Sequence, residues 1–115
     1  MTRAGLWLGA GRAVYIGPSL GLAPHSGSVA CLALGLDGPL RVHVGGGDPV
    51  RARSVLVPAR LTHRLVTESL RTAFCYVDPA ADRYRACRSL MAPSPTGVHV
   101  EHRHERELIE LAGAG

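Results

Sequence analysis

The stretch SVACLALGLDGPLRVHV, residues 28–44, decides the fold class of this chain. Its first part, SVACLALGL (28–36), is an apolar run of the kind found in buried strands. The Asp-Gly pair in DGP (37–39) is a turn signal. In LRVHV (40–44) apolar and polar residues alternate with a period of two, as a half-buried strand requires. The stretch therefore predicts two strands joined by a turn.

Segments of the same kind continue on both sides of this stretch. The further strand candidates are RAVYIG (12–17), VRARSVLVP (50–58), HRLVTES (63–69) and LRTAFCYVD (70–78). Loop residues separate them, in PSLGLAP (18–24) and GGGDP (45–49). A turn signal about every eight to twelve residues favours an antiparallel barrel or sandwich. The chain has 14 glycines and 8 prolines among 115 residues, which agrees with frequent turns.

The pattern changes at Asp78. DPAADRYRACRSLM (78–91) begins with Asp78 as a candidate N-cap and proline at the first helical position, and its apolar residues recur at helical spacing. APSPTG (92–97) is a predicted linker, and residues 105–111 are a predicted short helix that Gly113 ends. We therefore expect one domain, with a barrel over residues 1–78 and a C-terminal helical segment over residues 79–115 packed on it.

Composition narrows the classes of protein that the chain can be. All 13 basic residues are arginine, the net charge is +4, and the arginines are spread along the chain instead of forming a patch or stripe, so we expect no direct DNA binding. Three cysteines without a CxxC pair predict reduced thiols in a cytoplasmic protein. No apolar run has the length of a membrane span, and the short apolar stretch near the N-terminus is interrupted by Gly11 and Arg12. We expect neither a signal peptide nor contact with a membrane.

Two histidines are the main candidates for a functional site. His25 and His63 each lie beside a predicted strand, and each follows a proline-containing loop. Inward and outward side chains alternate along the strands of a small barrel, so two histidines from separate strands can meet inside it. Imidazole is both a common metal ligand and a good hydrogen-bond partner for a small molecule. Cys31 is a possible third donor, although it also fits a small buried residue.

The spacing around His25 resembles the first motif of the cupin superfamily. In that motif a second histidine and a glutamate follow the first histidine, and a glycine closes the turn. Here Gly27 stands at the second histidine position, Cys31 at the glutamate position, and Gly38 at the closing glycine. The resemblance implies a cupin-like antiparallel barrel, of the double-stranded β-helix or jelly-roll type, in which part of the metal-binding set is replaced.

The second cupin motif has a proline, a glycine two residues later and a histidine three residues after that. The matching residues here are Pro58, Arg60 and His63, so the glycine alone is replaced. A divalent catalytic site needs three or four protein donors, and these replacements leave two histidines. We therefore expect His25 and His63 to line a small-molecule pocket and expect no resident metal or other cofactor. A metal held by His25, Cys31 and His63 is the alternative.

A closer resemblance covers residues 5–91. The segments RAVYIGP, PHSGSVACLALGLDGPLRV, VLVPARLTHRL and FCYVDPAADRY are similar to the N-terminal sensing domain of AraC-type transcriptional regulators. In that family a cupin barrel binds an effector, the following helices often serve dimerisation, and a C-terminal helix-turn-helix part binds DNA. No helix-turn-helix pattern is present in VHVEHRHERELIELAGAG (98–115). The resemblance implies a non-catalytic ligand-sensing and dimerisation domain of a bacterial regulator.

The residues expected in each role follow from this interpretation. The predicted ligand-binding residues are His25, Cys31, His63, Trp7, Tyr15 and Arg41. The predicted dimerisation residues are Tyr84, Cys87, Leu90 and Met91, which could instead pack on the barrel. The tract HVEHRHE (99–105) is either a weak metal chelator or a solvated surface.

Three rival functions remain open at the level of sequence. One is a small metal-dependent cupin enzyme of the dioxygenase or isomerase type. Another is a structural dimerisation domain with a filled barrel. The third is a standalone cupin-like protein with no regulatory role.

Overall fold

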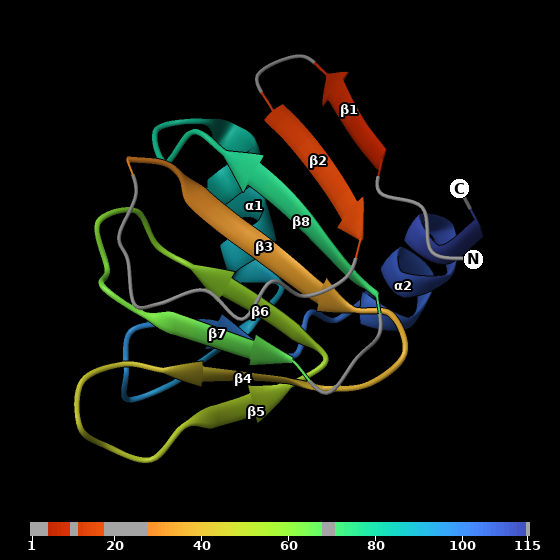
Figure 1. Ribbon diagram of the computed structural model, residues 1–115. Helices are drawn as coiled ribbons and strands as arrows, with labels where there is room; N and C mark the ends of the chain where they lie inside the picture. The colour runs from red at the N-terminus through yellow and green to blue at the C-terminus, as the bar shows by residue number, and fades with distance from the viewer. Residues whose placement is uncertain (1–4, 10–11, 18–27, 68–70, 115) are drawn as a thin grey trace.

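The structure, a computed structural model, describes residues 5–9, 12–17, 28–67 and 71–114. In residues 5–9 and 12–17, and at residues 67 and 114, it describes the backbone alone. The described strands form two antiparallel sheets, and two helices follow in the C-terminal part (Figure 1). The prediction of a mainly β chain with C-terminal helices is therefore confirmed. The described strands form two separate sheets and not a closed barrel.

The larger sheet has the strand order β1-β2-β8-β3-β6-β10-β9, and the smaller sheet has the order β5-β4-β7. The strands of the larger sheet are β1 (Gly5–Gly9), β2 (Arg12–Gly17), β3 (Ala30–Gly35), β6 (Ser54–Val57), β8 (Thr72–Val77), β9 (Ala92–Pro93) and β10 (His99–Val100). Those of the smaller sheet are β4 (Leu40–His43), β5 (Val50–Ala52) and β7 (Arg64–Thr67). The helices are α1 (Asp82–Ser89) and α2 (Glu105–Ala114).

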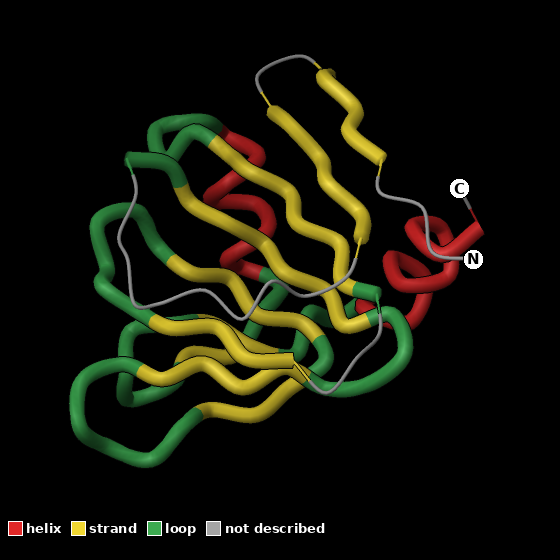
Figure 2. The backbone as a smooth tube through the Cα atoms, viewed as in Figure 1, coloured by secondary structure: helices red, strands yellow, loops and turns green. Residues whose placement is uncertain are grey.

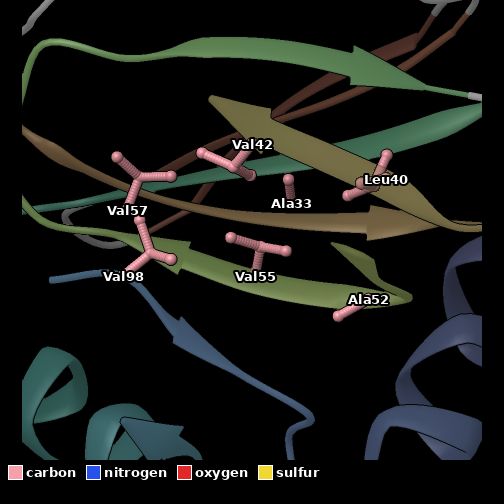
Figure 3. Packing of buried hydrophobic residues seen from close by; sticks show 7 residues of the cluster. All are labelled: Ala33, Leu40, Val42, Ala52, Val55, Val57 and Val98. Carbon is pink, nitrogen blue, oxygen red and sulfur yellow. The ribbon is translucent and has the colours of Figure 1, made fainter. Parts of the chain in front are cut away.

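The smaller sheet packs on the larger one through aliphatic side chains. The alternation in β4 buries Leu40 and Val42, both 0% exposed, and leaves Arg41 exposed on the opposite face. These two residues meet Ala33 of β3 and Val55 of β6 (Figure 3). The same cluster contains Ala52, Val57 and Val98. The period-two pattern in the sequence thus identifies the inner face of β4.

One predicted strand, residues 50–58, is divided because the chain changes sheet at Arg53. Its Nε donates a hydrogen bond to the carbonyl oxygen of Gly35 (2.8 Å), and its Nη2 donates one to that of Leu36 (2.9 Å). Gly35 has no room for a side chain here, since a Cβ would lie 1.9 Å from the carbonyl oxygen of Gly38. Arg53 therefore fixes the corner between β5 and β6 against the end of β3.

Both helices cover the other face of the larger sheet (Figure 2). Tyr84 of α1, with Met91 just after it, packs on Ala30, Leu56 and Val77. Helix α2 packs on residues at the opposite end of β3 and β8. The residues of that contact are Leu34, Leu36, Ala73, Leu108, Ile109 and Ala112. The middle strands of the larger sheet are thus covered by the smaller sheet on one face and by the two helices on the other.

Three predictions about the C-terminal part need correction. Asp78 does not cap α1, because its Oδ1 accepts the backbone N–H of Ala80 (2.9 Å) in a preceding turn, and the N-cap is Ala81. Helix α2 continues through Gly113 to Ala114. The segment 79–115 is also not purely helical, since the predicted linker contains β9, and β10 pairs with β6 in the larger sheet.

Candidate functional site

Cys31 lies on the face of the larger sheet that is turned toward the smaller sheet. In the strand register it stands opposite Val57 of β6 on one side and Tyr76 of β8 on the other. It is two residues before Ala33, so both side chains share the inner face. Burial raises the pKa of the Cys31 thiol to about 12, with a smaller effect from Cys75. At neutral pH Cys31 is therefore an uncharged thiol.

Two aromatic rings on β8 extend this surface. The rings of Phe74 and Tyr76 are stacked, with centroids 6.5 Å apart and an angle of 15° between their planes. Phe74 packs at the edge of the aliphatic cluster, whereas Tyr76 is 39% exposed. The inner face thus changes along the strands from tight aliphatic packing to a thiol beside a phenol.

His63 lies at the same end of the sheets. It directly precedes β7, and the short loop 58–62 connects it to Val57, the residue opposite Cys31. Its Nδ1 lies 2.8 Å from the carbonyl oxygen of Leu61. Because a carbonyl oxygen only accepts, Nδ1 is the donor, and the neutral ring then has its acceptor at Nε2. We call the group of Cys31, Val57, His63 and Tyr76 the Cys31 end; in Figure 1 it is the left-hand end of the strands.

The other predicted ligand-binding residues have different outcomes. His25 lies outside the described residues. Trp7 and Tyr15 belong to β1 and β2, of which the structure describes the backbone, and Tyr15 stands opposite Phe74 in the register. Arg41 is exposed on the outer face of β4, so it does not line the space between the sheets. The alternation in LRVH already indicates this outward position, because Arg41 stands between two residues that are buried, Leu40 and Val42.

The predicted dimerisation residues pack within the chain itself. Tyr84 and Met91 are 7% and 8% exposed, and Cys87 packs against their cluster. The Sγ of Cys87 also contacts the Sδ of Met91 at 3.8 Å. Leu90 is half-buried. The structure thus supports the packing role that the sequence left open for this stripe.

The histidines of residues 99–104 are separated in the fold. His99 is in β10, His102 is buried in the following loop, and the exposed His104 directly precedes α2. Across the described residues, no group of three or more His, Cys, Asp or Glu side chains is arranged to hold a metal ion. The only contact between two of these rings in the described part is a tilted one between His102 and His104, 5.9 Å apart.

A polar groove, which the sequence did not predict, lies at the opposite end of the sheets. This open groove has a volume of about 490 Å³. We call it the polar groove, and its lining residues are Pro39, Arg51, Ala52, Arg53, Glu101, His102, Arg103 and Glu105. In the sequence, the many charged residues in EHRHERE (101–107) are the one feature that points to this groove. The residues of β5 that also line it are far from this segment in the sequence, and only the fold brings them close.

Ser54 organises the wall of the polar groove, although its own side chain is fully buried. Its hydroxyl donates to Oε1 of Glu105 (2.5 Å) and accepts the backbone N–H of His102 (2.7 Å). The Nδ1 of His102 accepts the backbone N–H of His104 (3.0 Å). Burial lowers the pKa of His102, the charge of His104 lowers it further, and Glu105 acts in the opposite direction. These interactions favour a neutral His102.

Comparison with known proteins gives a fold but no function. No family model matches the chain, and no curated protein does either. The structure is similar to that of protein NMB1881 from Neisseria meningitidis, with a TM-score of 0.53 and 14% identity, covering 65% of this chain and 82% of that one. It is also similar to the conserved SPY1581 protein of unknown function from Streptococcus pyogenes, with a TM-score of 0.52 and 16% identity, covering 70% and 75%. Among the described residues, no helix has the length and apolar character needed to cross a membrane.

Proposed function

We propose that this chain is a ligand-sensing domain that binds a small molecule between its two sheets, at the Cys31 end, and performs no catalysis. The observation that carries the proposal is the change in character of the inner face. Tight aliphatic packing around Val42 and Val55 gives way to the thiol of Cys31, the phenol of Tyr76 and the imidazole of His63. Apolar walls with a few convergent polar groups are typical of small-molecule sites.

The uncharged Cys31 thiol and the fixed orientation of His63 suit binding by hydrogen bonds. A thiol with a pKa near 12 is neither a nucleophile nor a ready ligand for a metal at neutral pH. His63 is oriented by the hydrogen bond from its Nδ1 to the carbonyl oxygen of Leu61. Hydrogen-bonding groups without a carboxylate among them favour an uncharged or weakly polar effector over a cation.

The resemblance to AraC-type regulators supports the sensing role. Within this proposal the two sheets are an open form of a cupin-like barrel, and the chain works in a bacterial cytoplasm. DNA would be contacted through a helix-turn-helix part that this sequence does not contain. Self-association belongs to the same proposal, and it would use the exposed side of α1, since Tyr84 and Met91 are buried in the core.

A screen of metabolite-like compounds by ligand-observed NMR tests the proposal. Each compound that binds is then titrated against the parent chain and against two variants, Cys31→Leu and Cys87→Leu. Cys31→Leu fills the Cys31 end with a larger apolar side chain. Cys87→Leu makes the same chemical change beneath α1, on the other face of the sheet. We expect Cys31→Leu to weaken binding about tenfold or more and Cys87→Leu to leave the affinity unchanged. Absence of saturable binding, or equal affinities of the two variants, would overturn the proposal.

A further inference from the structure

Strand β1 forms one edge of the larger sheet. Among the described strands its partner is β2 alone, with Trp7 of β1 opposite Val14 of β2. In Figure 1 it is the outermost strand of that sheet, beyond β2 and β8. Successive residues of a strand direct their backbone N–H and C=O groups to alternate sides. The outer side of β1 therefore presents a row of backbone donors and acceptors on which a further strand can pair.

The other three edges of the two described sheets carry residues that oppose such pairing. The edge strand β9 contains Pro93, which has no backbone N–H to donate. The edges of the smaller sheet are β5 and β7, which carry the charged residues Arg51 and Arg64. Proline and charged residues on edge strands protect proteins against edge-to-edge association. The sequence of β1, GLWLG, contains neither.

The sequence of β1 is also symmetric about Trp7, because GLWLG reads the same in both directions. If two copies of β1 pair antiparallel across a two-fold axis at Trp7, Leu6 of one copy stands opposite Leu8 of the other. The glycines at the two ends then stand opposite each other, and they leave room for another backbone to approach. The same axis brings the outward-facing alternate residues of one copy opposite those of the other, as antiparallel hydrogen bonding requires.

We infer that β1 pairs antiparallel with β1 of a second copy of this chain, so that two larger sheets join into one continuous sheet. The pairing is isologous, and it closes as a dimer because each copy contributes the same edge. A strand of five residues makes a small interface, so the dimer dissociates on dilution. This surface is distinct from the exposed side of α1, and the pairing does not depend on a ligand at the Cys31 end.

Sedimentation velocity of the full chain over a range of protein concentrations tests the inference. We expect the parent chain to change from monomer to dimer as the concentration rises. Trp7→Lys and Trp7→Glu each place two like charges opposite each other at the axis, so each should weaken the dimer about tenfold or more. An equimolar mixture of the two variants should dimerise again, because opposite charges then face each other. This recovery requires that position 7 of one copy meet position 7 of the other.

Two further measurements separate the β1 edge from other surfaces. Arg83→Glu reverses an exposed charge on α1 and should leave the dissociation constant of the dimer unchanged. Amide hydrogen exchange of the parent chain needs no variant, so it decides the question even if the Trp7 variants fail to fold. Residues 5–9 should become better protected as the concentration rises, whereas residues 82–89 of α1 should not.

Four results would overturn the inference. A parent chain that stays monomeric would leave the β1 edge to a strand of another protein. Folded Trp7→Lys and Trp7→Glu chains that fail to dimerise when mixed, or that dimerise separately as tightly as the parent, would exclude the two-fold pairing at Trp7. An effect of Arg83→Glu as large as that of Trp7→Lys, or protection that rises on α1 in place of residues 5–9, would assign the contact to α1.

Discussion

Ser54 and Glu105 are 51 residues apart in the sequence, and the hydroxyl of Ser54 donates a hydrogen bond of 2.5 Å to Oε1 of Glu105. The same hydroxyl accepts the backbone N–H of His102. One buried side chain therefore ties the first turn of α2 and the loop before it to the first residue of β6. This contact joins the C-terminal segment to the sheets and shapes the polar groove.

Replacing Ser54 with alanine is expected to lower the free energy of unfolding by about 2–3 kcal/mol, because the backbone N–H of His102 loses its acceptor in a buried position. Urea unfolding followed by circular dichroism measures this change. Ser89→Ala removes an exposed hydroxyl that bonds the carbonyl of Ala86, and it should change stability by no more than about 0.5 kcal/mol. Equal stabilities of the two variants would contradict a structural role for Ser54.

Replacing Arg53 with lysine tests the corner between β5 and β6. Lysine keeps the positive charge, but its single ammonium group cannot reproduce the fork that bonds the carbonyls of Gly35 and Leu36. We expect a loss of about 1–2 kcal/mol in the free energy of unfolding. Arg83→Lys on the surface of α1 is the control, and a loss as large there would show that the fork geometry is unimportant.

Leu40→Ala tests the contact between the two sheets. Leu40 is 0% exposed and lies in the aliphatic cluster, so the substitution leaves a cavity and should cost about 2–5 kcal/mol. Leu111 is 74% exposed, and Leu111→Ala should stay within about 0.5 kcal/mol of the parent chain. Thermal unfolding of both variants checks the difference, and a small effect of Leu40→Ala would mean that the smaller sheet is not packed as described.

We expect acid to destabilise the fold, because the pKa values of His99 and His102 are lowered in the folded chain. Burial, followed by the charge of Arg88, lowers the pKa of His99, and burial together with His104 lowers that of His102. In the unfolded chain a histidine titrates near about 6.5, so the unfolded state takes up protons first as the pH falls. The stability that these two residues contribute is therefore complete above about pH 6.5 and is lost as the pH falls through their lower folded-state pKa values.

Urea unfolding at pH 8, 6 and 5 measures this loss. The pKa of the Asp37 carboxyl is lowered chiefly by its hydrogen bond with Arg71. Its titration therefore changes the stability only in more acidic solutions and does not affect the comparison between pH 8 and pH 5. His99→Gln should reduce the difference in stability between pH 8 and pH 5. A chain that is equally stable at both pH values would contradict the described burial of these rings.

Local patterns were sufficient for most of the strands. RAVYIG corresponds to β2, and the alternation in LRVHV predicts both β4 and the residues that it buries. Such periodicity reports which face of a strand is buried, because that property depends on near neighbours in the sequence. The same alternation showed that Arg41 would face outward, although we expected this residue in a pocket.

The remaining features depend on contacts between distant residues. No local signal shows that Arg53 would bond Gly35 and Leu36, or that the chain would change sheet there. The two short strands β9 and β10 form because β10 finds an edge at β6. The polar groove likewise combines β5 with residues 101–105, so only the fold brings its charges together.

Native mass spectrometry of the chain with the compounds found by the NMR screen is the decisive test of a ligand site between the two sheets. The measurement compares the parent chain with Cys31→Leu, which fills the Cys31 end, and with Arg103→Gln, which removes a cation from the polar groove. We expect a one-to-one complex for the parent chain and for Arg103→Gln, and none for Cys31→Leu. A complex that persists in Cys31→Leu, or the lack of any one-to-one complex, would contradict a site at the Cys31 end.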